Sequence, residues 1–122
     1  MNEHILREEL GVLAALNGMK ACALVDSHSG LVWHSVGGEA VEQTLWEAAS
    51  DYWRLHGRSN AHFASLGELG AAVLYHRLAV LAIVPCAGRS DLVVVCIASH
   101  QGVDWREWQR RVRAMGNRLK DL

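Results

Sequence analysis

Cysteine and histidine are the residues of this chain with the most versatile chemistry, because both can bind metals and take part in catalysis. Cys22, His28 and His34 lie close together in the sequence, and Cys96 lies shortly before His100. The first three fall on opposite faces of a predicted hairpin and lack further ligands, so we expect no zinc site. The apolar residues around Cys96 predict a buried thiol that is a weak nucleophile, so we expect no catalytic Cys–His pair there.

Other catalytic motifs are missing from the sequence. The chain has no G-x-x-x-x-G-K-[ST] phosphate loop, no G-x-G-x-x-G dinucleotide loop and no G-x-S-x-G nucleophile turn. Asp26 and Asp91 fall in predicted turns, where a carboxylate can bond to the backbone two residues on. We therefore predict a protein that is not an enzyme and that binds no metal or cofactor.

Composition limits the remaining classes. The chain has 122 residues, of which 51% are hydrophobic and 20% charged, and this predicts a single domain over residues 1–122. The formal net charge of −1 argues against a nucleic-acid partner. No apolar run is long enough to cross a membrane, and the N-terminus lacks the basic start of a signal peptide, so we expect a cytoplasmic protein with no membrane partner. An odd number of cysteines in apolar runs (Cys22, Cys86 and Cys96) indicates buried free thiols.

Hydrophobic periodicity predicts the elements that would position any functional residue. Apolar residues at helical spacing predict helices over Glu3–Leu16, Glu39–Leu55 and Trp105–Leu119. Asn17-Gly18 and Gly57 are the predicted stops of the first two helices, and Asp104 is the predicted N-terminal cap of the third. Apolar runs predict strands over Ala21–Val25, Leu31–Ser35, Glu68–Tyr75, Leu78–Val84 and Leu92–Ala98, and Ala61–Leu66 is ambiguous.

The order of these elements predicts the fold class. Strands joined by short turns must be antiparallel. The chain is therefore expected to be an α+β domain with a five-stranded, mainly antiparallel sheet, helices on both faces and the order α-β-β-α-β-β-β-α. The almost wholly apolar run Ala21–Val25 is typical of a central strand, whereas the alternating run Leu31–Ser35 is typical of a strand near an edge.

The middle helix carries two apolar stripes, although one is enough to cover a sheet. We assign Val41, Leu45, Ala48, Tyr52 and Leu55 to the core. Trp46, Ala49 and Trp53 form the second stripe, which we predict to be exposed, with Glu42 one turn before Trp46. An aromatic centre with a charged rim is typical of a protein interface, so we predict contact with a second subunit or a partner there. The alternative is that Ala61–Leu66 covers both tryptophans.

The last helix has a simple amphipathic pattern. Trp105, Trp108, Val112, Met115 and Leu119 form its predicted core stripe. Its other side is basic and carries Arg106, Arg110, Arg113 and Lys120. Such a face is either a solvated surface or a patch for an anionic partner.

The stretch from Asn17 to Val32 resembles the hairpin of the Roadblock/dynein-light-chain family, in which a Gly precedes an apolar strand that ends in Val-Asp and is followed by a turn with Gly-Leu. Ser65-Leu66-Gly67-Glu68-Leu69 resembles the family's Leu-Gly-Glu-Leu entry to its third strand. The element order agrees from Ile5 to Leu119. One difference is Gln101–Trp105, which replaces the family's usual Asn-Leu-Gly and following Arg.

The resemblance implies a Roadblock-like, profilin-like layered fold and a non-enzymatic homo- or heterodimer. In that family the sheets join through the third strand, here Glu68–Tyr75, and the paired middle helices form a platform for a small Ras-like GTPase. An MglB-like regulator of such a GTPase is therefore expected, as a homodimer. Its predicted interface residues are Glu42, Trp46, Ala49, Trp53, Gly70, Ala72 and Leu74. The alternative is a small-molecule sensor with profilin- or PAS-like architecture, which would need a polar-lined pocket.

Overall fold

A computed structural model describes residues 3–37, 41, 43–86 and 89–119. Its helices are α1 (Glu3–Ala14), α2 (Gln43–Ser59) and α3 (Trp105–Leu119), and a 3₁₀ helix, η1 (Asn60–Leu66), follows α2 directly. Its strands are β1 (Met19–Asp26), β2 (Val32–Val36), β3 (Ala72–Tyr75), β4 (Val80–Cys86) and β5 (Arg89–Ala98). The predicted element order is confirmed, with η1 added.

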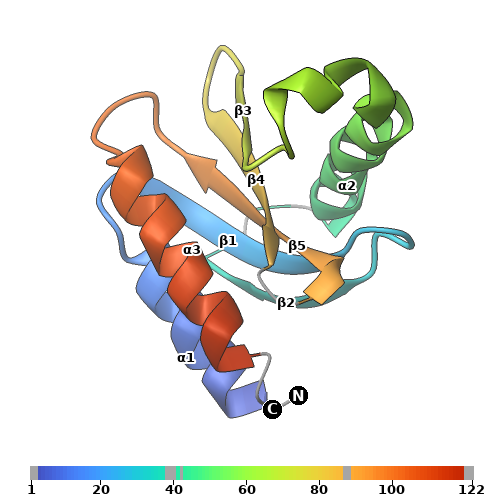
Figure 1. Ribbon diagram of the computed structural model, residues 1–122. Helices are drawn as coiled ribbons and strands as arrows, with labels where there is room; N and C mark the ends of the chain where they lie inside the picture. The colour runs from blue at the N-terminus through green and yellow to red at the C-terminus, as the bar shows by residue number, and fades with distance from the viewer. Residues whose placement is uncertain (1–2, 38–40, 42, 87–88, 120–122) are drawn as a thin grey trace.

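The strands form one antiparallel sheet in the order β2-β1-β5-β4-β3. Figure 1 shows α1 and α3 side by side on one face of this sheet, and α2 with η1 on the other. The predicted α+β class is therefore confirmed. The buried strand β1 lies inside the sheet, between β2 and β5, as its apolar sequence predicted, and the alternating strand β2 is an edge.

Two hydrophobic layers hold the helices to the sheet. Under α1 and α3 the predicted core stripe of α3 is confirmed, since Trp108, Val112, Met115 and Leu119 are all buried. Under α2 the layer contains mostly small or β-branched strand residues, with one large indole among them. These side chains are Ala21, Ala23, Val25, Trp46, Ala49, Leu81, Ile83, Val93 and Val95.

Local signals in the sequence set several boundaries. Asp104 caps α3 as predicted, because its Oδ1 accepts hydrogen bonds from the backbone N–H groups of Arg106 (3.1 Å) and Glu107 (3.2 Å). Asp26 binds its own turn as predicted, since its Oδ1 accepts from the N–H groups of His28 (2.8 Å) and Ser29 (2.9 Å).

Three other local predictions are wrong. Gly57 does not end α2, which runs on to Ser59, because the chain continues directly into η1 and keeps a helical turn there. The third strand begins at Ala72 rather than Glu68. Asp91 lies inside β5 rather than in a turn, because the pairing of β4 with β5 extends back to Arg89.

Candidate interaction surface

The third strand is a free edge of the sheet, because among the described strands β3 pairs only with β4. The N–H of His76 donates to the carbonyl of Ala79 at 3.0 Å, so these two residues form a hydrogen-bonded pair of the β3–β4 hairpin. Hydrogen-bonded and non-hydrogen-bonded pairs alternate along an antiparallel ladder. The N–H and C=O groups of Val73 and Tyr75 therefore point away from β4, in position to pair with another strand.

The prediction of which face of α2 is buried is wrong. Trp46 is only 1% exposed and Ala49 is equally buried, so neither can form an exposed stripe. Trp53 is half-buried and packs against the same hydrophobic layer. Of the residues assigned to the core, Leu45, Tyr52 and Leu55 lie on the outside instead, with exposed fractions of 41%, 42% and 53%. Ala48 is exposed as well, whereas Val41 is half-buried and packs against the layer, as predicted.

The facing strands explain this reversal. Ala21 and Ala23 on β1 are small, and with Ala49 they leave room for a large side chain between α2 and the sheet. The indole of Trp46 fills that room and buries far more apolar area than a leucine would. The sheet, and not the alternative cover Ala61–Leu66, buries Trp46, because the hydrophobic layer around its indole contains strand residues and none from η1.

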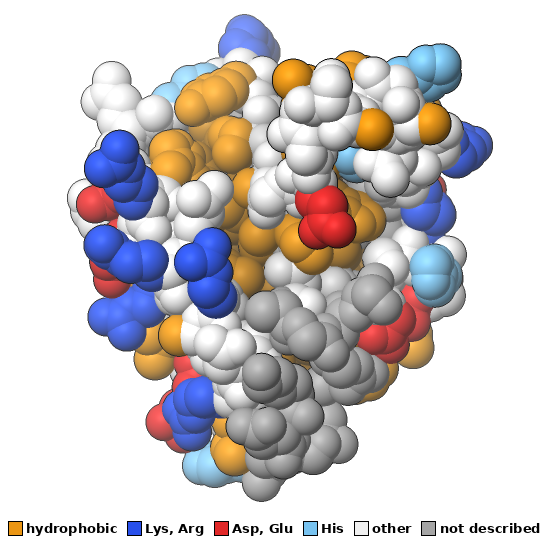
Figure 2. Space-filling model, viewed as in Figure 1, with side chains coloured by type: hydrophobic (Ala, Val, Ile, Leu, Met, Phe, Trp, Pro, Cys, Tyr) orange, Lys and Arg blue, Asp and Glu red, His pale blue; other side chains and the backbone are white. Residues whose placement is uncertain are grey.

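An apolar groove runs beside the exposed stripe of α2. It has a volume of about 330 Å³ and lies between α2 and the β3–β4 hairpin. Its α2 wall is formed by Leu45, Ala48, Ala49 and Tyr52, and its hairpin wall includes Leu78, Val80 and Leu81. The turn residue Leu78 is 79% exposed, so the groove opens to solvent through an apolar rim. Figure 2 shows a hydrophobic band over the β3–β4 region of the molecule, between α3 and the α2–η1 layer.

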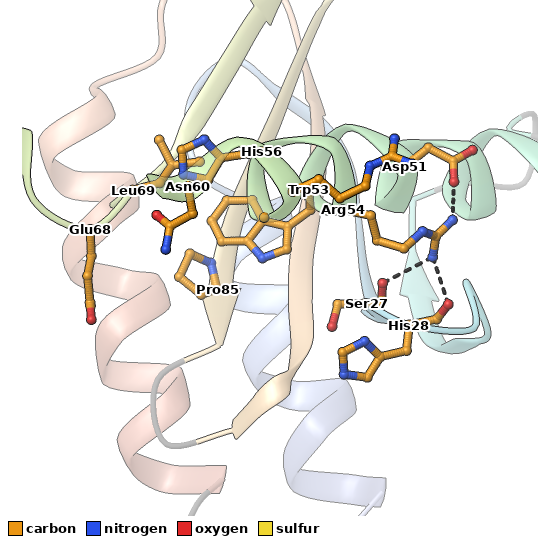
Figure 3. Close-up of a pocket in the computed structure, with 12 residues that line it drawn as sticks. Ser27, His28, Asp51, Trp53, Arg54, His56, Asn60, Glu68, Leu69 and Pro85 are labelled. Carbon is orange, nitrogen blue, oxygen red and sulfur yellow. Dashed lines mark hydrogen bonds and ion pairs between the residues drawn. The ribbon is translucent and has the colours of Figure 1, made fainter. Parts of the chain in front are cut away.

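A second hollow of about 850 Å³ lies at the other end of α2 (Figure 3). Trp53, Pro85 and Leu69 form its apolar part. Arg54 closes one side, since its guanidinium donates to the carbonyls of Ser27 (3.0 Å) and His28 (2.9 Å) and forms an ion pair with Asp51. This guanidinium ties α2 to the β1–β2 turn and is thereby occupied within the fold.

The predicted chemistry of the cysteines agrees with their placement. Cys22, Cys86 and Cys96 are buried and form no disulfide, as expected. The Sγ atoms of Cys22 and Cys96 lie 3.0 Å apart on neighbouring strands. This hydrogen bond and the burial of the thiol both raise the pKa of Cys22, so the thiol stays protonated and unreactive at neutral pH. Among the described residues, no group of three His, Cys, Asp or Glu side chains is placed to hold a metal ion.

No family model and no curated protein sequence matches the chain. Solved structures match it over nearly its whole length. A Roadblock/LC7 domain from Streptomyces avermitilis has a TM-score of 0.77 at 14% identity and covers 93% of each chain. MglB from Myxococcus xanthus has a TM-score of 0.75 at 16% identity, covering 99% of this chain and 90% of its own. The gliding protein MglB from Thermus thermophilus has a TM-score of 0.71 at 14% identity, covering 97% and 87% respectively.

The chain has the Roadblock/LC7 fold. The resemblance read from its hairpin and third-strand motifs is confirmed at this level. No helix in the part of the molecule that the structure describes is both long and apolar enough to cross a membrane.

Within this Roadblock/LC7 fold, the predicted interface residues separate into three groups. Ala72 and Leu74 lie on the free edge strand and face the α2 layer, and the exposed Gly70 precedes them. Trp46, Ala49 and Trp53 belong to the packing beneath α2, while Glu42 lies outside the described residues. Sequence reasoning missed Leu45, Tyr52 and Leu55 as surface residues. The small residues of β1 were the signal that could have reversed the assignment.

Proposed function

We propose that this chain is a non-enzymatic, homodimeric interaction module that binds and regulates a small Ras-like GTPase. The observation that carries the proposal is the exposed apolar stripe of α2 (Leu45, Tyr52 and Leu55) beside an apolar groove and a free strand edge. Apolar surface that is contiguous over two elements is typical of an interface.

A second copy of the chain fits this surface. Two β3 edges can pair through the outward N–H and C=O groups of Val73 and Tyr75, which would join two five-stranded sheets into one. The two-fold rotation that pairs the β3 edges also brings the α2 layers of both subunits together on one side of the joined sheet. Side chains of the α2 stripe, such as Tyr52, could then enter the groove of the other subunit.

The GTPase part of the proposal rests on the resemblance and on the MglB proteins among the structural neighbours. In the Roadblock family the paired middle helices form the platform for the GTPase. In this chain α2 presents Gln43, Glu47 and Asp51 on its exposed flank, away from the apolar stripe. These polar side chains supply the rim that a reversible partner needs.

The dimer is tested by size-exclusion chromatography with light scattering. We expect the mass of a dimer for the wild type and of a monomer for Leu45→Arg, because the substitution places a charge in the apolar interface. Gln43→Arg adds the same side chain to an exposed position on the other flank of α2 and should leave the dimer intact. A monomeric wild type at high micromolar concentration would refute the dimer.

The GTPase is tested by capture from cytosol on the immobilised dimer, with GDP or a non-hydrolysable GTP analogue present. We expect a Ras-like GTPase to be retained more strongly in one nucleotide state. The purified GTPase should then hydrolyse GTP at a different rate when the dimer is added. An unchanged rate and equal retention in both states would contradict a regulatory role.

The small-molecule sensor is a second candidate, favoured by the hollow of about 850 Å³ beside Trp53. A ligand that raises the melting temperature of the wild type, but not of Trp53→Leu, would support it.

A further inference from the structure

The arginines of the chain are concentrated on α3. This 15-residue helix carries Arg106, Arg110, Arg111, Arg113 and Arg118 but only one acidic residue, Glu107. The whole chain has a formal net charge of −1, so the helix is basic against an acidic remainder. Such local concentration of one sign of charge selects for a partner of the opposite sign.

The two flanks of α3 differ in how these charges are compensated. Arg118 forms an ion pair with Glu9 of α1, and Arg111 donates to Glu107 at 3.0 Å, so this flank faces α1 and is neutralised. Arg106 and Arg113 lie on the opposite flank, about 120–160° away by helical rotation. Both are exposed, and in the described part of the chain neither side chain has a carboxylate partner.

The uncompensated flank of α3 faces the free edge of the sheet. α1 packs over β1 and β2, while α3 packs over β4, which lies next to β3. On the same face of the sheet, Ala71 and Val73 of the β3 segment are only half-buried. Each subunit therefore has an apolar surface on β3 (Ala71 and Val73, the floor) next to a basic surface on α3 (Arg106 and Arg113, the wall). Figure 2 shows Lys and Arg side chains along α3 beside the hydrophobic band.

We propose that the dimer binds an acidic amphipathic segment of a partner protein in the groove between its two α3 helices. This inference rests on the proposed dimer, because pairing at β3 places the two apolar floors side by side between the two basic walls. Arg106 and Arg113 of each subunit then face the groove from both sides.

The chemistry of the groove selects this occupant. A segment with apolar residues on one side and Asp or Glu on the other can cover Val73 while its carboxylates pair with the guanidinium groups, which bind carboxylates in a bidentate manner. A nucleic acid would find phosphate contacts but only an apolar floor beneath them, and a flat membrane surface would not reach that floor. The site is on the face opposite α2, so it is separate from the GTPase platform.

The binding test uses a fluorescein-labelled 15-residue peptide, the length of α3, with leucines at helical spacing and glutamates elsewhere. We expect fluorescence anisotropy to show saturable binding to the wild-type dimer. Arg106→Glu with Arg113→Glu should weaken binding at least about tenfold. Arg111→Glu with Arg118→Glu changes the net charge equally on the other flank and should alter affinity by less than about twofold. A peptide with lysines in place of the glutamates should not bind.

Light scattering on the same samples separates the two proposals. A monomeric wild type would refute the dimer on which the groove depends, whereas a dimeric wild type that does not bind the peptide would refute the groove alone. Equal losses in the two double variants would overturn the proposal, because they would show attraction to net charge rather than to one flank. The proposal would also be overturned if the wild type sedimented with phosphatidylserine vesicles and the Arg106→Glu, Arg113→Glu double variant did not. That result would show that the flank binds a membrane surface.

Discussion

At the scale of single residues, Trp46 determines how α2 sits on the sheet. Its indole lies in the layer formed by Ala21, Ala23 and Val95 and is 1% exposed. Trp46→Ala should therefore lower the free energy of unfolding by about 3–5 kcal/mol, since it leaves a cavity that the small neighbours cannot fill. Chemical denaturation at a fixed protein concentration measures this change.

Trp33 provides the control for Trp46. It lies on the edge strand β2 and is 38% exposed, so Trp33→Ala should cost only about 1 kcal/mol. Similar losses for the two variants would contradict the buried position of Trp46. If Trp46→Ala gave a folded and fully stable monomer, Trp46 would have to lie in an exposed stripe, as the sequence first indicated.

Asp26 should make stability depend on pH. Backbone hydrogen bonds from Ser29 and then His28 lower the pKa of its carboxyl below the ordinary value of 3.8. The unfolded chain then binds a proton more readily than the folded one, so the carboxylate stabilises the fold above that value. This contribution is lost as the pH falls through the lowered pKa.

Asp26→Asn tests this pH dependence, because the amide oxygen keeps an acceptor in the turn but cannot titrate. We expect the wild type to lose more stability than the variant between neutral pH and about pH 2–3. The unfolding free energy at a series of pH values gives the difference. Parallel curves for both proteins would show that the pKa of Asp26 is the same in the folded and unfolded states.

At the scale of elements, α2 shows how a glycine can mislead a boundary prediction. Gly57 lies within the helix, and a Cβ added there would meet no other atom within 4 Å. Gly57→Ala should therefore stabilise the protein by about 0.5–1 kcal/mol, because alanine has a higher helix propensity. Thermal unfolding measures the gain as a higher melting temperature.

Gly18 is the contrasting position. It has a φ of 85°, and an added Cβ would lie 2.6 Å from Cγ2 of Val103. Gly18→Ala should therefore destabilise the protein by more than about 1 kcal/mol. If Gly57→Ala destabilised the protein as much as Gly18→Ala, the chain would have to leave the helix at Gly57, as the sequence prediction had it.

At the scale of the whole molecule, the free edge of β3 decides whether two sheets can join. Tyr75 is 68% exposed, and its N–H points away from β4. Proline is tolerated on an edge strand where the missing N–H faces solvent. Tyr75→Pro should thus leave the subunit folded but remove a hydrogen-bond donor from the β3 seam, the pairing of the two β3 strands in the dimer. Light scattering should then give the mass of a monomer.

Tyr75→Ala removes the same side chain but keeps the N–H, so this variant should remain dimeric. A dimer that survives Tyr75→Pro, with an unchanged circular-dichroism spectrum, would show that the subunits associate without the β3 seam. Loss of the dimer in both variants would assign the effect to the phenol ring instead.

The sequence by itself determined the element order, the interior position of β1, the cap at Asp104 and the turn at Asp26. Each depends on residues close together along the chain, whose periodicity or hydrogen bonding is visible locally. The core stripe of α3 was equally predictable, because only one of its faces is apolar.

Only the tertiary structure decided which stripe of α2 is buried, since both of its stripes are apolar and helical periodicity alone cannot rank them. The choice depends on the volume available across the layer, and Ala21 and Ala23, far from α2 in sequence, set that volume. The free edge of β3, which the family resemblance implied but no local pattern showed, depends on the strand order. The uncompensated flank of α3 depends on the Glu9–Arg118 contact, which joins distant parts of the chain.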